Sequence, residues 1–298
     1  MMTKNQFDVL TILEKSAAAL TQRKLSQIWR RSIGAVNKTV TELIQLGYVR
    51  NNKITQTGLE ALEPFRVKRA VFIAAGFGSR LMPITLNTPK PLVRINGRRI
   101  IDSMLDAVVA AGIEEIYIVR GYLAEQFDQL LYKYPSIQFI ENPAYNEANN
   151  ISSVMCARDS LSNAYILEGD LLLYNPNLIT KYQYTTNYLG VAVKKTDDWC
   201  LKTTGGMVSK IALGGVNCYH MFGISYWTQR DGIRLAEHVK RVYESPGGKE
   251  RYWDQVALEY YIKEYKIAVR PCTFEDVVEI DTLRELKQID CSYEKIGK

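Results

Sequence analysis

The run VFIAAGFGSRLMPITLNTPKPL, residues 71–92, constrains the fold of this chain more than any other stretch. It opens with consecutive apolar residues, which are typical of a strand that is buried on both faces. Gly76 and Gly78 then allow the backbone to approach a ligand closely, and successive N–H groups in such a turn suit phosphate oxygens. Arg80 offers two-point phosphate binding, and Lys90 offers a point charge between two prolines. The run therefore predicts a strand followed by a loop that wraps a nucleoside triphosphate.

Strand-like and helix-like segments alternate after this run. Such alternation predicts an α/β fold with a mostly parallel sheet, helices on both of its faces and ligands at the carboxyl ends of the strands. We assign residues 67–298 to this domain. The expected strands are AVFIAA, EIYIVRG, IQFIEN and AYILEGDLLL, and the expected helices are IIDSMLDAVVAAG, LAEQFDQLLYKY and NNISSVMCARDSL.

The first 66 residues follow a different pattern. Three amphipathic helical segments precede YVRNNKITQTG, which reads as two short strands about an Asn-Asn turn, and a further short helix follows. Helices in this order with a hairpin make a small winged helix-turn-helix domain, and residues 1–66 resemble the MarR-type winged-helix family. We therefore expect this domain to precede the α/β domain.

DNA is one expected partner of the N-terminal domain. The segment from Ser32 to Gln45 would enter the major groove, with Asn37, Lys38 and Thr39 facing bases. Residues 1–66 contain ten Lys or Arg against five Asp or Glu, a net charge of +5, whereas the whole chain carries +6. Small winged helices also serve as regulatory or dimerisation modules, so a homodimer stays open beside DNA binding.

Composition favours an ordinary cytoplasmic protein. The five cysteines are scattered without a CxxC pair, which fits a reducing compartment and disfavours a disulfide framework or zinc knuckle. The N-terminus lacks the apolar core of a signal peptide, and no stretch approaches the roughly 18 apolar residues of a membrane span, so we expect no membrane. Only two histidines are present, which leaves little material for histidine-based catalysis.

The whole run after the first strand resembles the signature of nucleotidyltransferases, which join a nucleoside triphosphate to a phosphorylated small molecule. That pattern reads AAGxGSRxxPxTxxxPKxL, and each of its fixed positions is matched here. The run is neither a dinucleotide fingerprint, since a third glycine is missing, nor a P-loop. The resemblance implies a Rossmann-like nucleotidyltransferase sheet, with catalytic roles for Arg80, Lys90 and Asp170. The nucleotide-binding residues that it implies are Ala74, Ala75, Gly76, Gly78, Ser79, Arg80, Lys90 and Gly121.

A divalent cation is expected, because phosphoryl chemistry of this kind needs a metal to bridge phosphates. Asp170 follows a buried apolar strand and matches the magnesium-binding aspartate of the family. The late segment VVEIDTL offers Glu279 and Asp281, of which we choose Asp281 as the second Mg²⁺ ligand. Asp281 also precedes a helix-like segment, so a role as a helix cap is the rival interpretation.

The acceptor is expected to carry a cation, because aromatic residues gather in the second half of the chain. The segments RGYLAEQFD, NNISSV, WC, YWDQ and EIDT, together with the signature, resemble bacterial phosphocholine cytidylyltransferases from residue 69 onward. The resemblance implies acceptor-binding roles for Asn150, Trp199, Tyr252, Trp253 and Asp254.

We therefore expect a Mg²⁺-dependent cytidylyltransferase that makes CDP-choline and pyrophosphate from CTP and phosphocholine. The first alternative keeps the chemistry but takes 2-aminoethylphosphonate or phosphoethanolamine, whose primary ammonium needs carboxylates more than aromatic rings. The second is a transcriptional regulator that senses a nucleotide. A phosphate monoester oxygen is already anionic near neutral pH, so the reaction needs no general base, which fits the scarcity of histidine.

Overall fold

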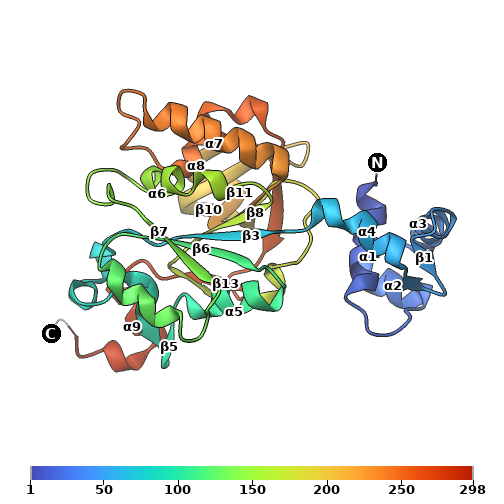
Figure 1. Ribbon diagram of the computed structural model, residues 1–298, viewed down its shortest axis with the longest axis horizontal. Coiled ribbons are helices and arrows are strands. Elements are labelled where there is room, and N and C mark those ends of the chain that lie inside the picture. Colours follow the sequence, from blue (N-terminus) through green and yellow to red (C-terminus); the bar gives the residue numbers. More distant parts are fainter. Residues whose placement is uncertain (1, 297–298) are drawn as a thin grey trace. The chain divides into compact units, whose positions relative to one another are not determined.

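The computed structural model describes residues 2–296 and divides the chain into two compact units (Figure 1). Unit 1 comprises Met1–Arg66 together with Tyr182–Tyr184, and unit 2 comprises Val67–Lys181 and Thr185–Lys298. No helix within the described range combines the length and the apolar character needed to cross a bilayer.

Unit 1 contains four helices and one hairpin. The helices α1, α2, α3 and α4 span Lys4–Glu14, Gln22–Trp29, Ile33–Gln45 and Gln56–Leu62, and the strands β1 and β2 span Val49–Arg50 and Lys53–Ile54. Each helix starts after a Ser or Thr whose hydroxyl accepts a backbone N–H. Asn51 and Asn52 both have positive φ, which confirms the Asn-Asn turn. The assignment to the winged helix-turn-helix class stays a prediction.

Unit 2 is built on a seven-stranded sheet in the order β10-β12-β11-β8-β3-β6-β7. The strand β3 lies between β6 and β8 and runs parallel to both, and β6 is also parallel to β7. The strand β11 joins β8 in the antiparallel sense, so the sheet is mostly parallel at its centre and mixed at one side. The strands are β3 Arg69–Ile73, β6 Glu115–Arg120, β7 Ile137–Glu141, β8 Ala164–Glu168, β10 Asn187–Thr204, β11 Met207–Trp227 and β12 Ala268–Cys272.

Alternate side chains of β3 enter two separate cores, because successive residues of a strand point to opposite faces. Ala70 and Phe72 pack in one core with residues of α5, while Val71 and Ile73 pack in the other with residues of α6, α7 and α8. Helices cover both faces of the sheet, as Figure 1 shows. These helices are α5 Asp102–Ala110, α6 Ile151–Cys156, α7 Gln229–Tyr243 and α8 Trp253–Gln255.

A smaller layer packs beside the loop that follows β3. The hairpin of β4 and β5, Arg94–Ile95 and Arg98–Arg99, shares a buried cluster with α9, Leu283–Ile289. The strand β13, Val277–Glu279, pairs antiparallel with β9, Leu171–Leu173. Because β9 follows β8, this pairing places β13, a segment near the end of the chain, close to the carboxyl end of β8.

Two expected elements differ from the structure. AYILEGDLLL was expected as one strand, but Gly169 and Asp170 separate β8 from β9. LAEQFDQLLYKY was expected as a helix, whereas Ala124–Leu130 forms a 3₁₀ segment. There the Arg120 guanidinium donates to the carbonyl of Ala124, which an α-helix would have used for its own ladder.

Candidate active site

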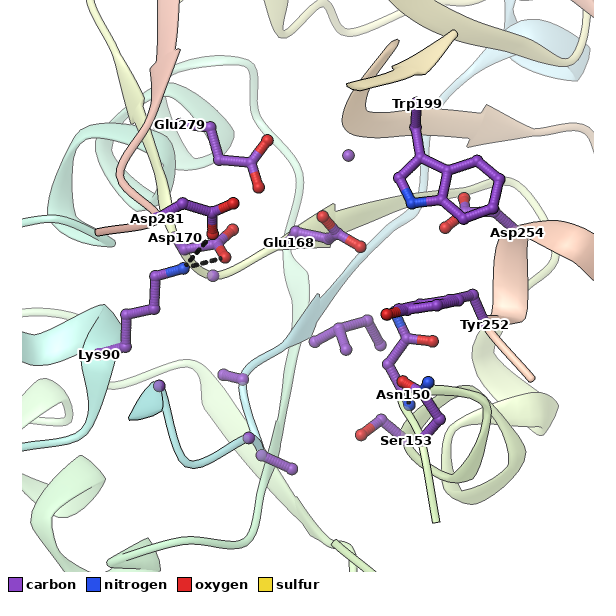
Figure 2. A pocket seen from close by; sticks show the side chains of 18 of the residues that line it. Lys90, Asn150, Ser153, Glu168, Asp170, Trp199, Tyr252, Asp254, Glu279 and Asp281 are labelled. Atoms are coloured by element: carbon purple, nitrogen blue, oxygen red, sulfur yellow. Dashed lines mark hydrogen bonds and ion pairs between the residues drawn. The ribbon is translucent and has the colours of Figure 1, made fainter. Parts of the chain in front are cut away.

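One pocket of about 670 Å³ lies at the carboxyl ends of β3 and β8. The loop after β3 forms one side, and residues of α6, α8 and the β10–β11 hairpin form the other (Figure 2). Of the site residues expected for this domain, the structure brings to the pocket Ala74, Ala75, Gly76, Gly78, Ser79, Arg80, Lys90, Asn150, Asp170, Trp199, Tyr252, Asp254 and Asp281.

The turn at Gly78 requires glycine for two reasons. Its φ is +62°, and an added Cβ would lie 2.8 Å from the Cβ of Lys90. The buried hydroxyl of Thr85 donates to the Gly78 carbonyl at 2.9 Å and ties the turn to the later part of the loop. The glycine thus brings the backbone of the first turn against the stem of Lys90.

Tyr122 contacts the same loop at several points, and the sequence analysis did not name it as a residue of the site. Its backbone N–H donates to the carbonyl of Ala75 at 3.0 Å, and its hydroxyl donates to the carbonyl of Thr85 at 2.9 Å. Its ring packs on Phe77 with centroids 5.0 Å apart. One side chain therefore holds the first and the middle parts of the loop together.

Three carboxylates converge on the wall opposite the loop (Figure 2). Glu168 ends β8, Asp170 follows it after one glycine, and Glu279 ends β13. The register of β13 places Glu279 opposite Leu171, which brings the late segment beside Asp170. One oxygen atom from each of the three carboxylates lies within 4.8 Å of the others. Burial, followed by the charge of Asp170, raises the pKa of both Glu168 and Glu279 well above the usual range.

This cluster fits a divalent cation. The Oδ1 atom of Asp170 is buried and has no hydrogen-bond partner among residues 2–296, so an acceptor is unused within an acidic site. Carboxylate oxygens are the ligands that Mg²⁺ prefers. Glu168 and Glu279 were not chosen from the sequence, although both stand two residues from an aspartate that was chosen. Asp281 lies beside the cluster rather than within it.

Lys90 connects this acidic wall to the loop. Its Nζ donates to Asp170 at 2.7 Å and to Asp281 at 2.8 Å, and Asp281 also accepts from Arg80 at 2.9 Å. Lys90 is only 8% exposed. Burial alone would lower the pKa of Lys90, but the charges of both aspartates outweigh it and raise this pKa. The ammonium is therefore held in its charged form at the centre of the site.

The other end of the pocket combines aromatic rings with carboxylates. The rings of Trp199 and Tyr252 meet edge to face with centroids 5.8 Å apart. In Figure 2, Glu168 lies between these rings and the carboxylates of Asp170 and Glu279. Asn150 also lines this end, and its side-chain oxygen accepts a hydrogen bond from the backbone N–H of Trp253 at 2.9 Å. Such a mixed wall suits a small organic cation.

Asp254 is the buried carboxylate of this end. It accepts a hydrogen bond of 2.8 Å from the hydroxyl of Tyr188, another residue that was not expected from the sequence. Burial raises the pKa of Asp254 to about 7, and the hydrogen bond from Tyr188 opposes this rise. A cation bound beside Asp254 would favour its ionised form.

Two expected site residues do not line the pocket. Trp253 is fully buried, stacks on Tyr188 at 6.0 Å and belongs to the core, so its assignment to an aromatic cage is wrong. Gly121 also lies outside the lining because the ring of Tyr145 covers it; an added Cβ would meet that ring at 2.7 Å. Tyr145 itself lines the pocket in its place.

In unit 1, the expected base-facing residues separate by exposure. Asn37 and Lys38 are exposed on α3, whereas Thr39 is 4% exposed and faces the core of the unit. The assignment of Thr39 to a base contact is therefore wrong, because the side chain is turned inward by the helical period. Ser32 caps α3 and is not part of it.

Comparison with known proteins places this site in context. Residues 69–208 match the family model described as nucleotidyl transferase. The 2-aminoethylphosphonate cytidylyltransferase of Lancefieldella rimae is 35% identical over 228 residues, which cover 75% of this chain and 92% of that protein. The choline-phosphate cytidylyltransferase of Haemophilus influenzae is 32% identical over 226 residues, which cover 74% and 95% of the two chains.

A solved structure agrees with the fold of unit 2. The structure of CTP:phosphocholine cytidylyltransferase from Streptococcus pneumoniae matches with a TM-score of 0.70 and 29% identity. The match covers 76% of this chain and 99% of the other.

Proposed function

This chain belongs to the nucleotidyl transferase family and is a cytidylyltransferase by its relatives, and from this premise we propose that it couples CTP to a phosphorylated or phosphonylated small amine. The proposal rests on one observation, the network of ion pairs on one side of the pocket. Lys90 pairs with Asp170 and Asp281, and Arg80 pairs with Asp281. Cations and carboxylates in this arrangement neutralise phosphates and hold a metal in the same place.

The chemistry is a displacement at the α-phosphorus of CTP. An anionic oxygen of the acceptor forms a bond to this phosphorus, the bond to the bridging oxygen of pyrophosphate breaks, and pyrophosphate leaves with the electron pair. Lys90 and Arg80 offset the charge that accumulates on the phosphate oxygens, and the loop from Ala75 to Gly78 orients the triphosphate. No proton has to be removed from the acceptor oxygen at neutral pH, which accounts for a site without histidine.

We further propose that the site holds Mg²⁺. Asp170, Glu168 and Glu279 would hold the ion, and Asp281, which lies beside them, is a further candidate ligand. When bound, the ion would withdraw charge from the phosphate groups of the nucleotide.

For the acceptor we favour a primary ammonium, as in 2-aminoethylphosphonate or phosphoethanolamine. With Trp253 buried, two rings remain at this end, Trp199 and Tyr252, and the carboxylates of Glu168 and Asp254 lie near them. A primary ammonium donates hydrogen bonds to carboxylates, whereas a trimethylammonium gains most from a complete aromatic cage. Phosphocholine is the second candidate, supported by the relatives from Haemophilus and Streptococcus.

A pyrophosphate-release assay tests the proposal. The purified protein is given each of the four ribonucleoside triphosphates with Mg²⁺, and each is paired with 2-aminoethylphosphonate, phosphoethanolamine, phosphocholine and glucose 1-phosphate. We expect release with CTP and the amines, and the highest kcat/KM with a primary amine. The proposal would be refuted if pyrophosphate were released only with glucose 1-phosphate, or if none of the four acceptors gave release.

For unit 1 we propose duplex DNA as a second ligand. The exposed side chains of Asn37 and Lys38 lie on α3, and exposed Arg30, Arg31 and Arg50 make no ion pair within residues 2–296. Unpaired cations of this kind release counterions from phosphates on binding.

Fluorescence anisotropy with duplex DNA from the upstream region of the gene tests this second proposal. We expect binding that weakens steeply with salt and is reduced in Lys38→Ala, with Lys263→Ala, an exposed lysine of unit 2, as the matched control. Equal affinity of the wild-type protein and Lys38→Ala, or no binding at low salt, would refute it.

A further inference from the structure

We propose that Lys90 competes with the divalent cation for Asp170, so that the metal binds tightly only when a nucleotide phosphate draws the lysine away. The inference rests on the proposed function and deepens it, because it assigns Lys90 a second role beyond phosphate binding. In this view the ion pairs of Lys90 couple metal binding to nucleotide binding.

The geometry supports competition at a single carboxylate. Lys90 Nζ donates to the Oδ2 atom of Asp170 at 2.7 Å (Figure 2). The Oδ1 atom of the same carboxylate has no hydrogen-bond partner in the part of the chain that the structure describes. A metal ligated by Asp170 would sit next to a fixed ammonium, and two cations at one carboxylate repel each other. The buried position of Lys90 limits screening of that repulsion by water.

The charges of the site point the same way. Four carboxylates line this wall, Glu168, Asp170, Glu279 and Asp281, and Lys90 is the cation that touches two of them. Of these four carboxylates, Arg80 pairs with Asp281, and the Arg80 side chain is 67% exposed. Lys90 is therefore the internal counterion of Asp170, and a metal ion must replace it in that role.

Nucleotide binding offers Lys90 an alternative partner. The lysine belongs to the loop that cradles phosphates, and its stem lies against Gly78 of the same loop. A phosphate anion held by this loop would attract the ammonium and leave the carboxylates free for the metal. By linkage, metal and phosphate then strengthen each other's binding by the same factor.

Titration of Mn²⁺ without nucleotide tests the inference. Free Mn²⁺ is measured by electron paramagnetic resonance for the wild-type protein, Lys90→Met and Lys90→Gln. We expect both variants to bind Mn²⁺ about tenfold more tightly than the wild type. This magnitude follows from the removal of one competing charge in a partly screened site. Lys263→Met removes the same charge from an exposed residue outside the pocket and should leave the affinity unchanged.

A second measurement covers the case in which the Lys90 variants fail to fold. CMP, which carries one phosphate and chelates Mn²⁺ weakly, should tighten Mn²⁺ binding to the wild-type protein severalfold and should have little effect in the variants. Variants that bind Mn²⁺ no more tightly than the wild type, or a wild type that is indifferent to CMP, would overturn the inference. Because no turnover is measured, this outcome is independent of whether any acceptor releases pyrophosphate.

Discussion

Lys90 donates a 2.7 Å hydrogen bond to Asp170, although the two residues are 80 positions apart in the sequence. One stands in the loop after β3 and the other follows β8, the strand that lies beside β3 in the sheet. Parallel neighbours end at the same edge, so this pairing brings the proposed phosphate ligand and the proposed metal ligand to one point.

The first prediction concerns turnover. Lys90→Met should lower kcat about 10²- to 10³-fold, because the group that offsets charge on the α-phosphate is lost. Lys263→Met is the control for the change in net charge, and circular dichroism checks that the variant is folded. A Lys90→Met variant that is folded and turns over at the wild-type rate would contradict the proposed role.

The second prediction separates the two acceptor types. If the acceptor is a primary amine, Asp254→Asn should raise its KM by about tenfold or more, because a charge-assisted hydrogen bond is lost. Trp199→Ala should raise the KM for the same acceptor by a smaller factor. The reverse order, with the larger effect at Trp199, would favour phosphocholine. Steady-state kinetics at saturating CTP measures both.

The third prediction concerns pH. Burial raises the pKa of Asp254 to about 7, so the free protein carries a proton there at pH values where an ordinary carboxyl has lost it. Binding of an ammonium favours the ionised form, so the KM for the acceptor should fall as pH rises from about 6 to about 8. The acceptor phosphate titrates in the same range, and Asp254→Asn removes only the contribution of the protein. An identical pH profile in the variant and the wild type would refute the assignment.

The same pKa has a consequence for folding. The folded protein holds the proton of Asp254 up to about pH 7, whereas the unfolded chain loses it near 3.8. The stabilisation from this group is therefore complete below the unfolded value and is lost as pH rises through about 7. Thermal unfolding of Asp254→Asn should depend less on pH than that of the wild type over this interval.

The fourth prediction concerns the loop. Tyr122→Phe removes a hydroxyl that donates to the carbonyl of Thr85, so the KM for CTP should rise severalfold and stability should fall by about 1 kcal/mol. Tyr132→Phe is the matched control, because that side chain is fully exposed. If both variants have the KM of the wild type, the loop does not depend on Tyr122.

Much of unit 2 could be predicted from its sequence. The apolar run that precedes Gly76 and Gly78 predicted a buried strand followed by a loop, and β3 lies inside the sheet between β8 and β6. Asp170 could be placed at the pocket because a carboxylate after a buried strand lies at the sheet edge. The division of AYILEGDLLL was missed, because apolar runs do not reveal where hydrogen bonding changes from one sheet to another.

The acceptor end was less predictable. Trp199, Tyr252 and Trp253 look alike in sequence, yet Trp253 packs in the core beside Tyr188. Tyr252 precedes α8 with extended backbone, whereas Trp253 is the first residue of that helix, so the two adjacent side chains face different surroundings. Tyr188, which donates to Asp254, and Glu279, which lies beside Glu168, stand on strands that are distant in the sequence. These two contacts could be found only in the folded chain.

The amino-acid sequence by itself determined the order of strands and helices, the glycine-containing loop after β3 and the residue types of the site, because these depend on local pattern and backbone freedom. Tertiary structure alone decided which carboxylates meet, that Lys90 lies between Asp170 and Asp281, and that Trp253 is withdrawn from the pocket. The reason is that electrostatic contacts depend on separations of a few ångströms, and those separations are set by strand register and packing between segments far apart in the chain.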